Sequence, residues 1–409
     1  MKRKTTGLVS ILFLALLAAA ANVVATHYLF TVRFPGANDF YPRWRGAQLF
    51  WQEGLDPYSE AATQAIQEGI YGRAAQPDED QVLFAYPFYT VFFVFPLVWL
   101  PYPWVQAIWL VFLEFALLMG VFLTLDMLRW RLPRWLTVLT ALWTLFFYHS
   151  VRTIFLGQFA GFVFFAVVIT LWCLRKERDL VAGVALAATT LKPQMSVLII
   201  PVLLLWGLGR RRWRFLASFG VSMGVLIGLS FVLVPGWAVA FFQQMTLYPS
   251  YTAIGSPVWI LTHYYAPGLG VVGEVLLSGI LLLVLLAQWR YMWGEEIDSG
   301  VSWWVLGLTL VVTNLIVTRT ATTNYVVLYV PLFFALKMAL DRVRRPNLSL
   351  AVFYGGSALA IWWLFLGTVV VRYEHPIVYL PLPLGLLLVF VLGRRWLVSN
   401  DSEPGHAAS

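Results

Sequence analysis

Few side chains in this sequence could do chemistry: one carboxylate, Asp39, and a few cations beside apolar segments. Asp39 follows the first long apolar stretch and could act as a general base that removes the proton of a hydroxyl group. The alternative is a helix cap, because an aspartate shortly before a proline such as Pro42 is a common helix start. Both interpretations place Asp39 where an apolar segment meets water.

Several cations lie where membrane topology does not require positive charge, and they could bind an anion such as a phosphate: Arg152, Lys192, Arg319, Arg372, and Arg43 or Arg45. Lys192 is the strongest of them, because a charge inside the apolar run 180–206 is costly unless it faces a cavity or an anion. The alternative is that its ammonium snorkels to the membrane interface. Arg152 and Arg319 lie at segment ends, where snorkelling is easy.

Other acidic residues allow two readings each. Asp78 and Asp80 have a spacing that can hold a divalent metal, although a solvated acidic turn is the commoner meaning. Glu114 and Glu274 could relay protons or could hydrogen-bond between helices, and we favour the second. The five histidines show no metal-ligand spacing, and no glycine-rich phosphate loop or Ser/His/Asp elbow is present. We therefore expect no metal and no cofactor.

The elements that position these residues must be membrane helices. The 409 residues are 60% hydrophobic and 12% charged, with a mean hydropathy of +0.76, which excludes a soluble domain. The net charge of +8 does not indicate a nucleic-acid binder, because Lys and Arg occur in short clusters between apolar runs. The single cysteine, Cys173, excludes an intrachain disulfide. The fold class predicted is an all-α polytopic membrane protein.

Apolar runs predict about 12–13 membrane segments in a single domain, residues 1–399, followed by a cytoplasmic tail, residues 400–409. The segments are 7–30, 83–100, 104–128, 135–149, 157–174, 180–191, 193–208, 215–234, 269–293, 301–317, 324–340, 348–371 and 376–392. The first could be a cleaved signal peptide, given its basic start and its alanine run, but we prefer a retained helix.

Basic clusters orient these segments, because positive loops stay in the cytoplasm. The clusters are Arg129/Arg131/Arg134, Arg175/Lys176/Arg178, Arg210 to Arg214, Arg342/Arg344/Arg345 and Arg394/Arg395. Thirteen crossings cannot join two cytoplasmic termini, so one segment between residues 83 and 128 is expected not to cross fully. The residues do not tell which. Asp39, Gln158, Lys192 and the connection 235–267 then lie on the outer side.

The outer loop, residues 31–82, is the longest hydrophilic segment. Phe40, Trp44 and Ala47 recur at helical spacing, and Arg45 and Gln48 fall on the opposite face. This pattern is typical of a helix that lies in the membrane–water interface. Gly54 should end that helix, and residues 60–70 predict a second short helix.

Several short motifs in this order resemble membrane glycosyltransferases of the GT-C fold, and most closely glycosyltransferase family 87, the polyprenyl-phosphate-mannose-dependent mannosyltransferase-like group. The motifs are Asp39-Phe40, Gly54-x-Asp56-Pro57-Tyr58, Phe84-x-Tyr86-Pro87, Gly157-Gln158, Lys192-Pro193 and Arg210 to Arg214. They cover roughly the first 215 residues. The chain departs from the family in having Phe88 where members often have a second proline, Ala160 where an asparagine is frequent, and no histidine in residues 319–325.

The resemblance implies an inverting sugar transfer, most readily of mannose, from a polyprenyl-phosphate donor to a lipid-linked or glycolipid acceptor at the outer face of the cell membrane. It implies that Asp39 is the base. Lys192, Arg319 and Arg152 are then expected at the donor phosphate, and the expected substrate-binding residues are Arg43, Tyr58, Tyr86, Gln158 and Asn324. The alternative is a secondary transporter for an anionic or lipid-linked substrate, which would favour related halves with broken helices, and no convincing internal repeat is visible.

Overall fold

Every regular element in the described part of the chain is helical. The computed structural model describes residues 2–34, 36–251, 255–370 and 374–398, so Arg372 and the expected tail lie outside the described residues. The helices of eight or more residues are α1 (Lys2–Thr26), α2 (Tyr41–Glu53), α3 (Glu60–Tyr71), α5 (Tyr102–Met127), α6 (Arg134–Phe146), α7 (Tyr148–Phe155), α8 (Ala160–Arg175), α9 (Asp179–Ala188), α11 (Ile199–Gly209), α12 (Trp213–Leu233), α13 (Trp237–Tyr251), α15 (Gly270–Trp289), α16 (Gly300–Ile316), α17 (Tyr329–Leu340), α18 (Pro346–Thr368) and α19 (Pro381–Leu392). Shorter helical turns are η1 (His27–Thr31), α4 (Thr90–Val94), η2 (Phe95–Leu97), η3 (Thr189–Leu191), α10 (Pro193–Ser196), α14 (Pro257–Trp259), η4 (Ile260–Tyr265), η5 (Arg290–Met292), η6 (Thr322–Leu328), η7 (Pro376–Tyr379) and α20 (Arg394–Val398).

Six helical segments of the described residues are long and apolar enough to cross a membrane: Leu14–Thr31, Tyr102–Met127, Trp213–Leu233, Gly270–Met292, Thr322–Leu340 and Pro346–Thr368. Helices α6 and α7 meet the same test as a pair bent by 53°, and shorter apolar helices include α8, α11 and α16. Helices α12, α15 and α18 expose large apolar side chains such as Val232, Val272 and Leu359, as lipid-facing helices do. The expectation of an all-α polytopic membrane protein is confirmed.

Residues 83–100 form no spanning helix. They contain only the short turns α4 and η2, because Pro87, Pro96 and Pro101 remove backbone donors that a continuous helix would need. The next segment, α5, runs unbroken for 26 residues. The basic clusters require one of the two segments between residues 83 and 128 not to cross the membrane, and residues 83–100 are that segment.

The first loop contains the two expected helices. Gly54 ends α2 with a left-handed backbone, φ 68°, and the Ser59 side chain caps α3 by accepting from the Ala62 N–H at 3.2 Å. The position of α2 at the membrane interface stays a prediction, but its apolar face packs on protein and not on lipid. Phe40, Trp44 and Ala47 are buried inside the protein, because the broken segment 83–98 covers the apolar face of α2.

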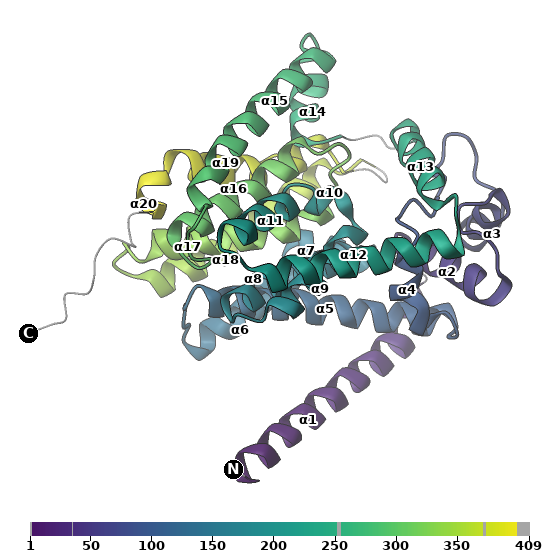
Figure 1. Ribbon diagram of the computed structural model, residues 1–409, viewed down its shortest axis with the longest axis horizontal. Helices are drawn as coiled ribbons and strands as arrows, with labels where there is room; N and C mark the ends of the chain where they lie inside the picture. The colour runs from purple at the N-terminus through teal and green to yellow at the C-terminus, as the bar shows by residue number, and fades with distance from the viewer. Residues whose placement is uncertain (1, 35, 252–254, 371–373, 399–409) are drawn as a thin grey trace, which may run out of the picture.

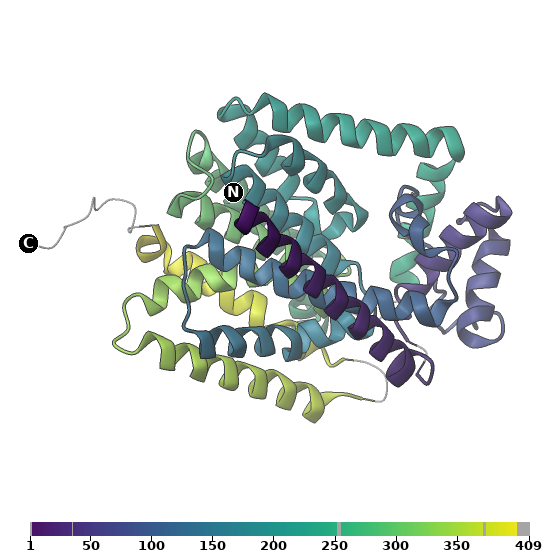
Figure 2. The same ribbon diagram turned by 90° about the horizontal axis from the view of Figure 1, so that it is seen from below.

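The loop helices gather at one end of the helix bundle. Figure 1 shows α2, α3 and α13 beside the same ends of α5 and α12, and α13 lies in the segment 235–267 that the sequence presents as a connection. Helix α1 leans away from the bundle in Figure 1, and in the view from below it crosses in front of the bundle (Figure 2). It meets α5 near its own C-terminal end, where the Asn22 amide donates to the Glu114 carboxylate at 2.9 Å. This bond supports the helix-to-helix reading of Glu114.

Candidate active site

The loop that carries Asp39 rests on the turn after α7. The N–H groups of Ala37 and Asp39 donate to the carbonyls of Phe155 and Leu156, at 3.2 and 3.1 Å. Gly157 in that turn has φ 66°, and a Cβ there would lie 2.6 Å from the Cβ of Ala37. Glycine is therefore required at this position for two reasons: its backbone conformation and the close approach of the Asp39 loop.

The Asp39 carboxylate does not cap α2, so the helix-cap interpretation is wrong. The capping position is Phe40, with no side-chain cap. Asp39 Oδ2 instead accepts a hydrogen bond from Gln158 Nε2 at 2.6 Å. The Phe40 ring, stacked on Trp109 with centroids 4.3 Å apart, fixes the backbone beside it. The carboxylate is thus directed into the protein by packing and not along the helix axis.

Gln158 joins Asp39 to Lys192. The Lys192 ammonium donates to Gln158 Oε1 at 2.6 Å. An ammonium can only donate and a carboxylate can only accept, so the two partners fix which end of the amide faces which. Because Gln158 stands between the two charges, Asp39 keeps Oδ1 for a substrate proton. Lys192 keeps two of its three N–H donors for an anion.

Lys192 lies between η3 and α10, outside the span-length helices, and its residue surface is only 4% exposed. The snorkelling alternative is therefore excluded. Burial lowers the pKa of Lys192 to about 7, Asp39 acts to raise that pKa, and Arg43 lowers it. A buried ammonium with donors to spare is a site prepared for a negatively charged ligand.

Arg43 brings a second cation to Asp39. Its Nη1 donates to the Asp39 carbonyl at 3.0 Å, and its guanidinium carbon lies 4.2 Å from the centroid of the Tyr86 ring. Its Nε is buried and has no hydrogen-bond partner among the described residues. Arg45, the alternative cation of the same helix, instead donates to Gln48 at 2.6 Å.

Tyr86 contacts Arg43, and Tyr58 contacts Tyr86 in turn. The Tyr58 hydroxyl donates to the Tyr86 carbonyl at 2.5 Å. The neighbouring Ala85, at φ 41°, donates its N–H to the Gln244 side chain of α13 at 2.8 Å. The loop, the broken segment and α13 are therefore tied together at the site, and Gln244 is a contributor that the sequence did not single out.

Arg152 belongs to a second cluster of polar contacts. Arg152 Nε lies 2.7 Å from the Glu374 carboxylate, which also accepts from Tyr148 and from Thr322. Glu374 was not among the expected residues, although its place between the last two apolar segments is a signal that could have indicated a partner for Arg152. The Thr153 hydroxyl links this cluster to the loop 317–324 by donating to the Thr323 carbonyl at 3.0 Å.

Arg319 lies in the loop before η6, and Asn324 lies in η6 itself. Arg319 has φ 60°, and Asn324 is buried with an Oδ1 that has no hydrogen-bond partner in the described part of the chain. The structure joins Asp39, Gln158, Lys192 and Arg43 in one set of contacts. The expected phosphate contacts of Arg152 and Arg319 stay predictions.

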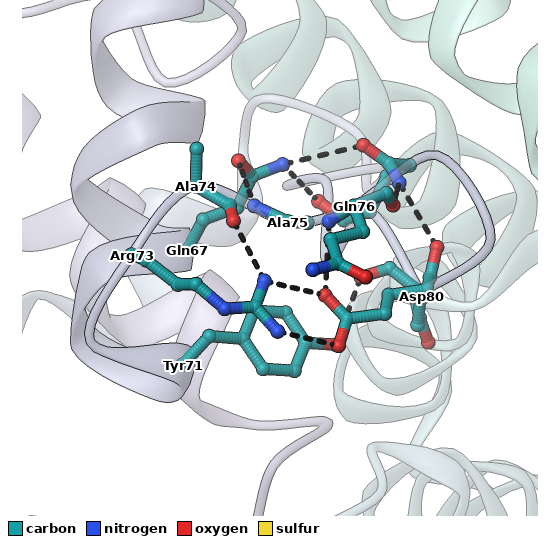
Figure 3. A network of polar contacts seen from close by, with 9 residues as sticks. Gln67, Tyr71, Arg73, Ala74, Ala75, Gln76 and Asp80 are labelled. Atoms are coloured by element: carbon teal, nitrogen blue, oxygen red, sulfur yellow. Dashed lines mark hydrogen bonds and ion pairs between the residues drawn. The ribbon is translucent and has the colours of Figure 1, made fainter.

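The acidic triplet forms a closed surface loop (Figure 3). Both guanidinium ends of Arg73 donate to the Glu79 carboxylate at 2.8 Å. Asp80 Oδ1 accepts from the Val82 N–H at 2.9 Å. Burial raises the pKa of Asp80, Asp39 raises it further, and Arg43 opposes them, although part of the Asp80 surface reaches solvent. Among the described residues, no three His, Cys, Asp or Glu side chains are grouped as a metal site would require.

Comparison with known proteins gives one finding. The model of glycosyltransferase family 87 matches residues 84–313, which is more than half of the chain. No curated protein and no solved structure matches. The matched region includes Tyr86, Gln158 and Lys192, whereas Asp39 precedes it.

Proposed function

Because the chain belongs to glycosyltransferase family 87, we propose that it transfers mannose from a polyprenyl-phosphate donor to a hydroxyl of a lipid-linked or glycolipid acceptor, with inversion at the anomeric carbon. The observation that carries the proposal is the row Asp39–Gln158–Lys192. It places a base and a buried cation on either side of one amide. A transfer of a sugar between oxygens needs one of each.

The base acts on the acceptor. Asp39 Oδ1 removes the proton of the attacking hydroxyl while the hydroxyl oxygen forms a bond to the anomeric carbon. The bond from that carbon to the phosphate oxygen breaks in the same displacement, which inverts the configuration. Gln158 Nε2, held at 2.6 Å from Asp39 Oδ2, orients the carboxylate for this step.

The cations act on the departing phosphate. Lys192 and the free Nε of Arg43 can each donate to a phosphate oxygen as negative charge develops there. A lipid monophosphate carries less charge than a nucleotide diphosphate, so these two groups can replace a metal ion. Arg152 and Arg319 are proposed as further phosphate contacts, with Arg152 sharing its charge with Glu374.

The donor and the sidedness follow from the arrangement of the helices. A lipid donor can enter sideways from the bilayer past lipid-facing helices such as α12 and α18. The clusters around Arg129, Arg175 and Arg344 lie at the ends of apolar helices, and on the positive-inside rule these ends are cytoplasmic. Tyr102, at the opposite end of α5 from Arg129, donates to the Ala37 carbonyl at 3.0 Å. We therefore propose that Asp39 works at the outer face of the cell membrane.

The test is direct. Purified protein is incubated with a panel of radiolabelled polyprenyl-phosphate sugars and with a native lipid extract, and new glycolipids are separated by chromatography. The proposal predicts one labelled product, formed from the mannose donor. Transfer from a nucleotide sugar in the absence of any lipid-phosphate donor would contradict it.

A further inference from the structure

A cationic pocket lies at the end of α5 farthest from Asp39. The cavity, of about 390 Å³, is bounded by the last turn of α5, the start of α6 and the end of α8. Four cations line it together with one acid, Asp126: Arg129, Arg131, Arg175 and Lys176. Helix α5 is 26 residues long, about 39 Å, so this pocket and Asp39 lie near opposite membrane surfaces.

The acids nearby do not neutralise the pocket. Arg175 lies 3.1 Å from Asp298 and 3.7 Å from Asp126, and Arg129 lies 3.3 Å from Asp298. Arg131 and Lys176 form no ion pair among the described residues, and both are exposed. The four cations therefore exceed the two acids, and two positive charges remain for a ligand.

The pocket also has an apolar part, which distinguishes it from a turn that carries only basic side chains. Phe122, Leu125 and Trp130 line it beside the cations. Next to it, α6 exposes Trp135 and Val138, at 53% and 59% of their surfaces, on a helix that forms part of the membrane bundle. The pocket thus adjoins a helix that exposes large apolar side chains.

We propose that this pocket binds the headgroup of an anionic phospholipid. The phosphate lies between Arg131 and Lys176, and Trp130 contacts the glycerol backbone. The acyl chains run along the exposed face of α6. Basic pockets between membrane helices are suited to such headgroups, and each nearby Lys or Arg adds to their attraction. This site does not depend on the proposed sugar transfer.

Full-length protein in a neutral detergent is titrated with phosphatidylglycerol, with phosphatidylcholine, and with soluble glycerol phosphate, and bound lipid is counted by native mass spectrometry. The pocket variant carries Arg131→Gln and Lys176→Gln. Its matched control carries Arg344→Gln and Arg345→Gln, which remove the same charge from the exposed turn between α17 and α18. The melting temperature without lipid confirms that each variant is folded.

We expect the pocket variant to bind phosphatidylglycerol about 25-fold more weakly than the wild type, at roughly a fivefold loss for each of the two charges. The control variant should lose less than threefold, and phosphatidylcholine binding should not change in either variant. An equal loss in both variants would mean general surface attraction and would overturn the proposal. Equally tight binding of glycerol phosphate and phosphatidylglycerol would also overturn it, because the ligand would then be a soluble phosphate.

Discussion

Replacing Lys192 by methionine should abolish most of the transfer without unfolding the protein. Methionine is similar in length and apolar, so it fits a position that is 4% exposed. The change removes the donor to Gln158 Oε1 and the two donors that we assign to the phosphate. Losing one donor to a developing oxyanion costs about 2.7–4 kcal/mol, so kcat/KM for the lipid donor should fall about 100- to 1000-fold.

The stability of this variant should move little, because two effects oppose each other. The unpaired Gln158 oxygen costs about 1–3 kcal/mol, whereas removing a buried ammonium is favourable. The melting temperature measures their difference. A variant that keeps its melting temperature and loses its activity separates the role in binding from a role in folding.

The pH profile gives an independent readout of Lys192. Its pKa is lowered to about 7, so the ammonium is charged below pH 7 and becomes neutral as the pH rises through that value. Attraction of the donor phosphate should then be lost, and kcat/KM should decline above about pH 7. Lys192→Arg keeps its charge throughout and should remove this decline. The reasoning is refuted if Lys192→Met retains kcat/KM within threefold of the wild type, or if Lys192→Arg leaves the alkaline decline unchanged.

Three further predictions concern the geometry, the metal and the sidedness. Gly157→Ala should lower the free energy of unfolding by about 1–3 kcal/mol and displace Asp39, because the new Cβ would lie 2.6 Å from the Cβ of Ala37. The control Gly54→Ala is also at positive φ but has nothing within 4 Å of the new Cβ, so it should keep its transfer activity. Equal transfer activity in the two variants would contradict the account. Transfer should survive exhaustive EDTA treatment, and activity that returned only with Mg²⁺ or Mn²⁺ would oppose the metal-free mechanism. In a Cys173→Ser background, Asp78→Cys should be labelled from outside the cell and Arg344→Cys only after permeabilisation, and the reverse pattern would place the site on the other side.

The helices were largely predictable because their signal is local. Apolar runs predict α5, α12 and α18 to within a few residues, and Gly54 and the range 60–70 locate the loop helices. The failure of 83–100 to form a spanning helix was only half predictable. The prolines, and the number of crossings that the basic clusters allow, indicated that one segment between residues 83 and 128 does not cross the membrane. Packing against α2 decides which segment this is.

The contacts of the apolar face of α2 could not be predicted, for a related reason. A stripe of Phe40, Trp44 and Ala47 is equally suited to lipid and to protein, and periodicity does not distinguish the two environments. The broken segment 83–98 supplies an apolar cover, and its free carbonyls accept from α2, for example Val98 from the Gln48 amide at 3.2 Å. That partner is 50 residues away, beyond the reach of any helical pattern.

The site was predictable as a set of residue types but not as a set of contacts. The family resemblance, which the match over residues 84–313 confirms, pointed to Asp39, Gln158 and Lys192. That Gln158 stands between the other two depends on the Gly157 turn, which meets the Asp39 loop across more than 100 residues of sequence. Glu374, the partner of Arg152, carries no motif and was missed.

The most direct test of the central claim is the rate of transfer by Asp39→Asn in a single turnover, with donor binding measured in parallel. Asparagine keeps the volume and can still accept from Gln158 Nε2, so the contacts around it survive and only the base is lost. The account predicts a rate lower by about 100- to 10,000-fold, with donor affinity and melting temperature close to those of the wild type. Transfer by Asp39→Asn at a rate near that of the wild type would contradict the assignment of Asp39 as the base.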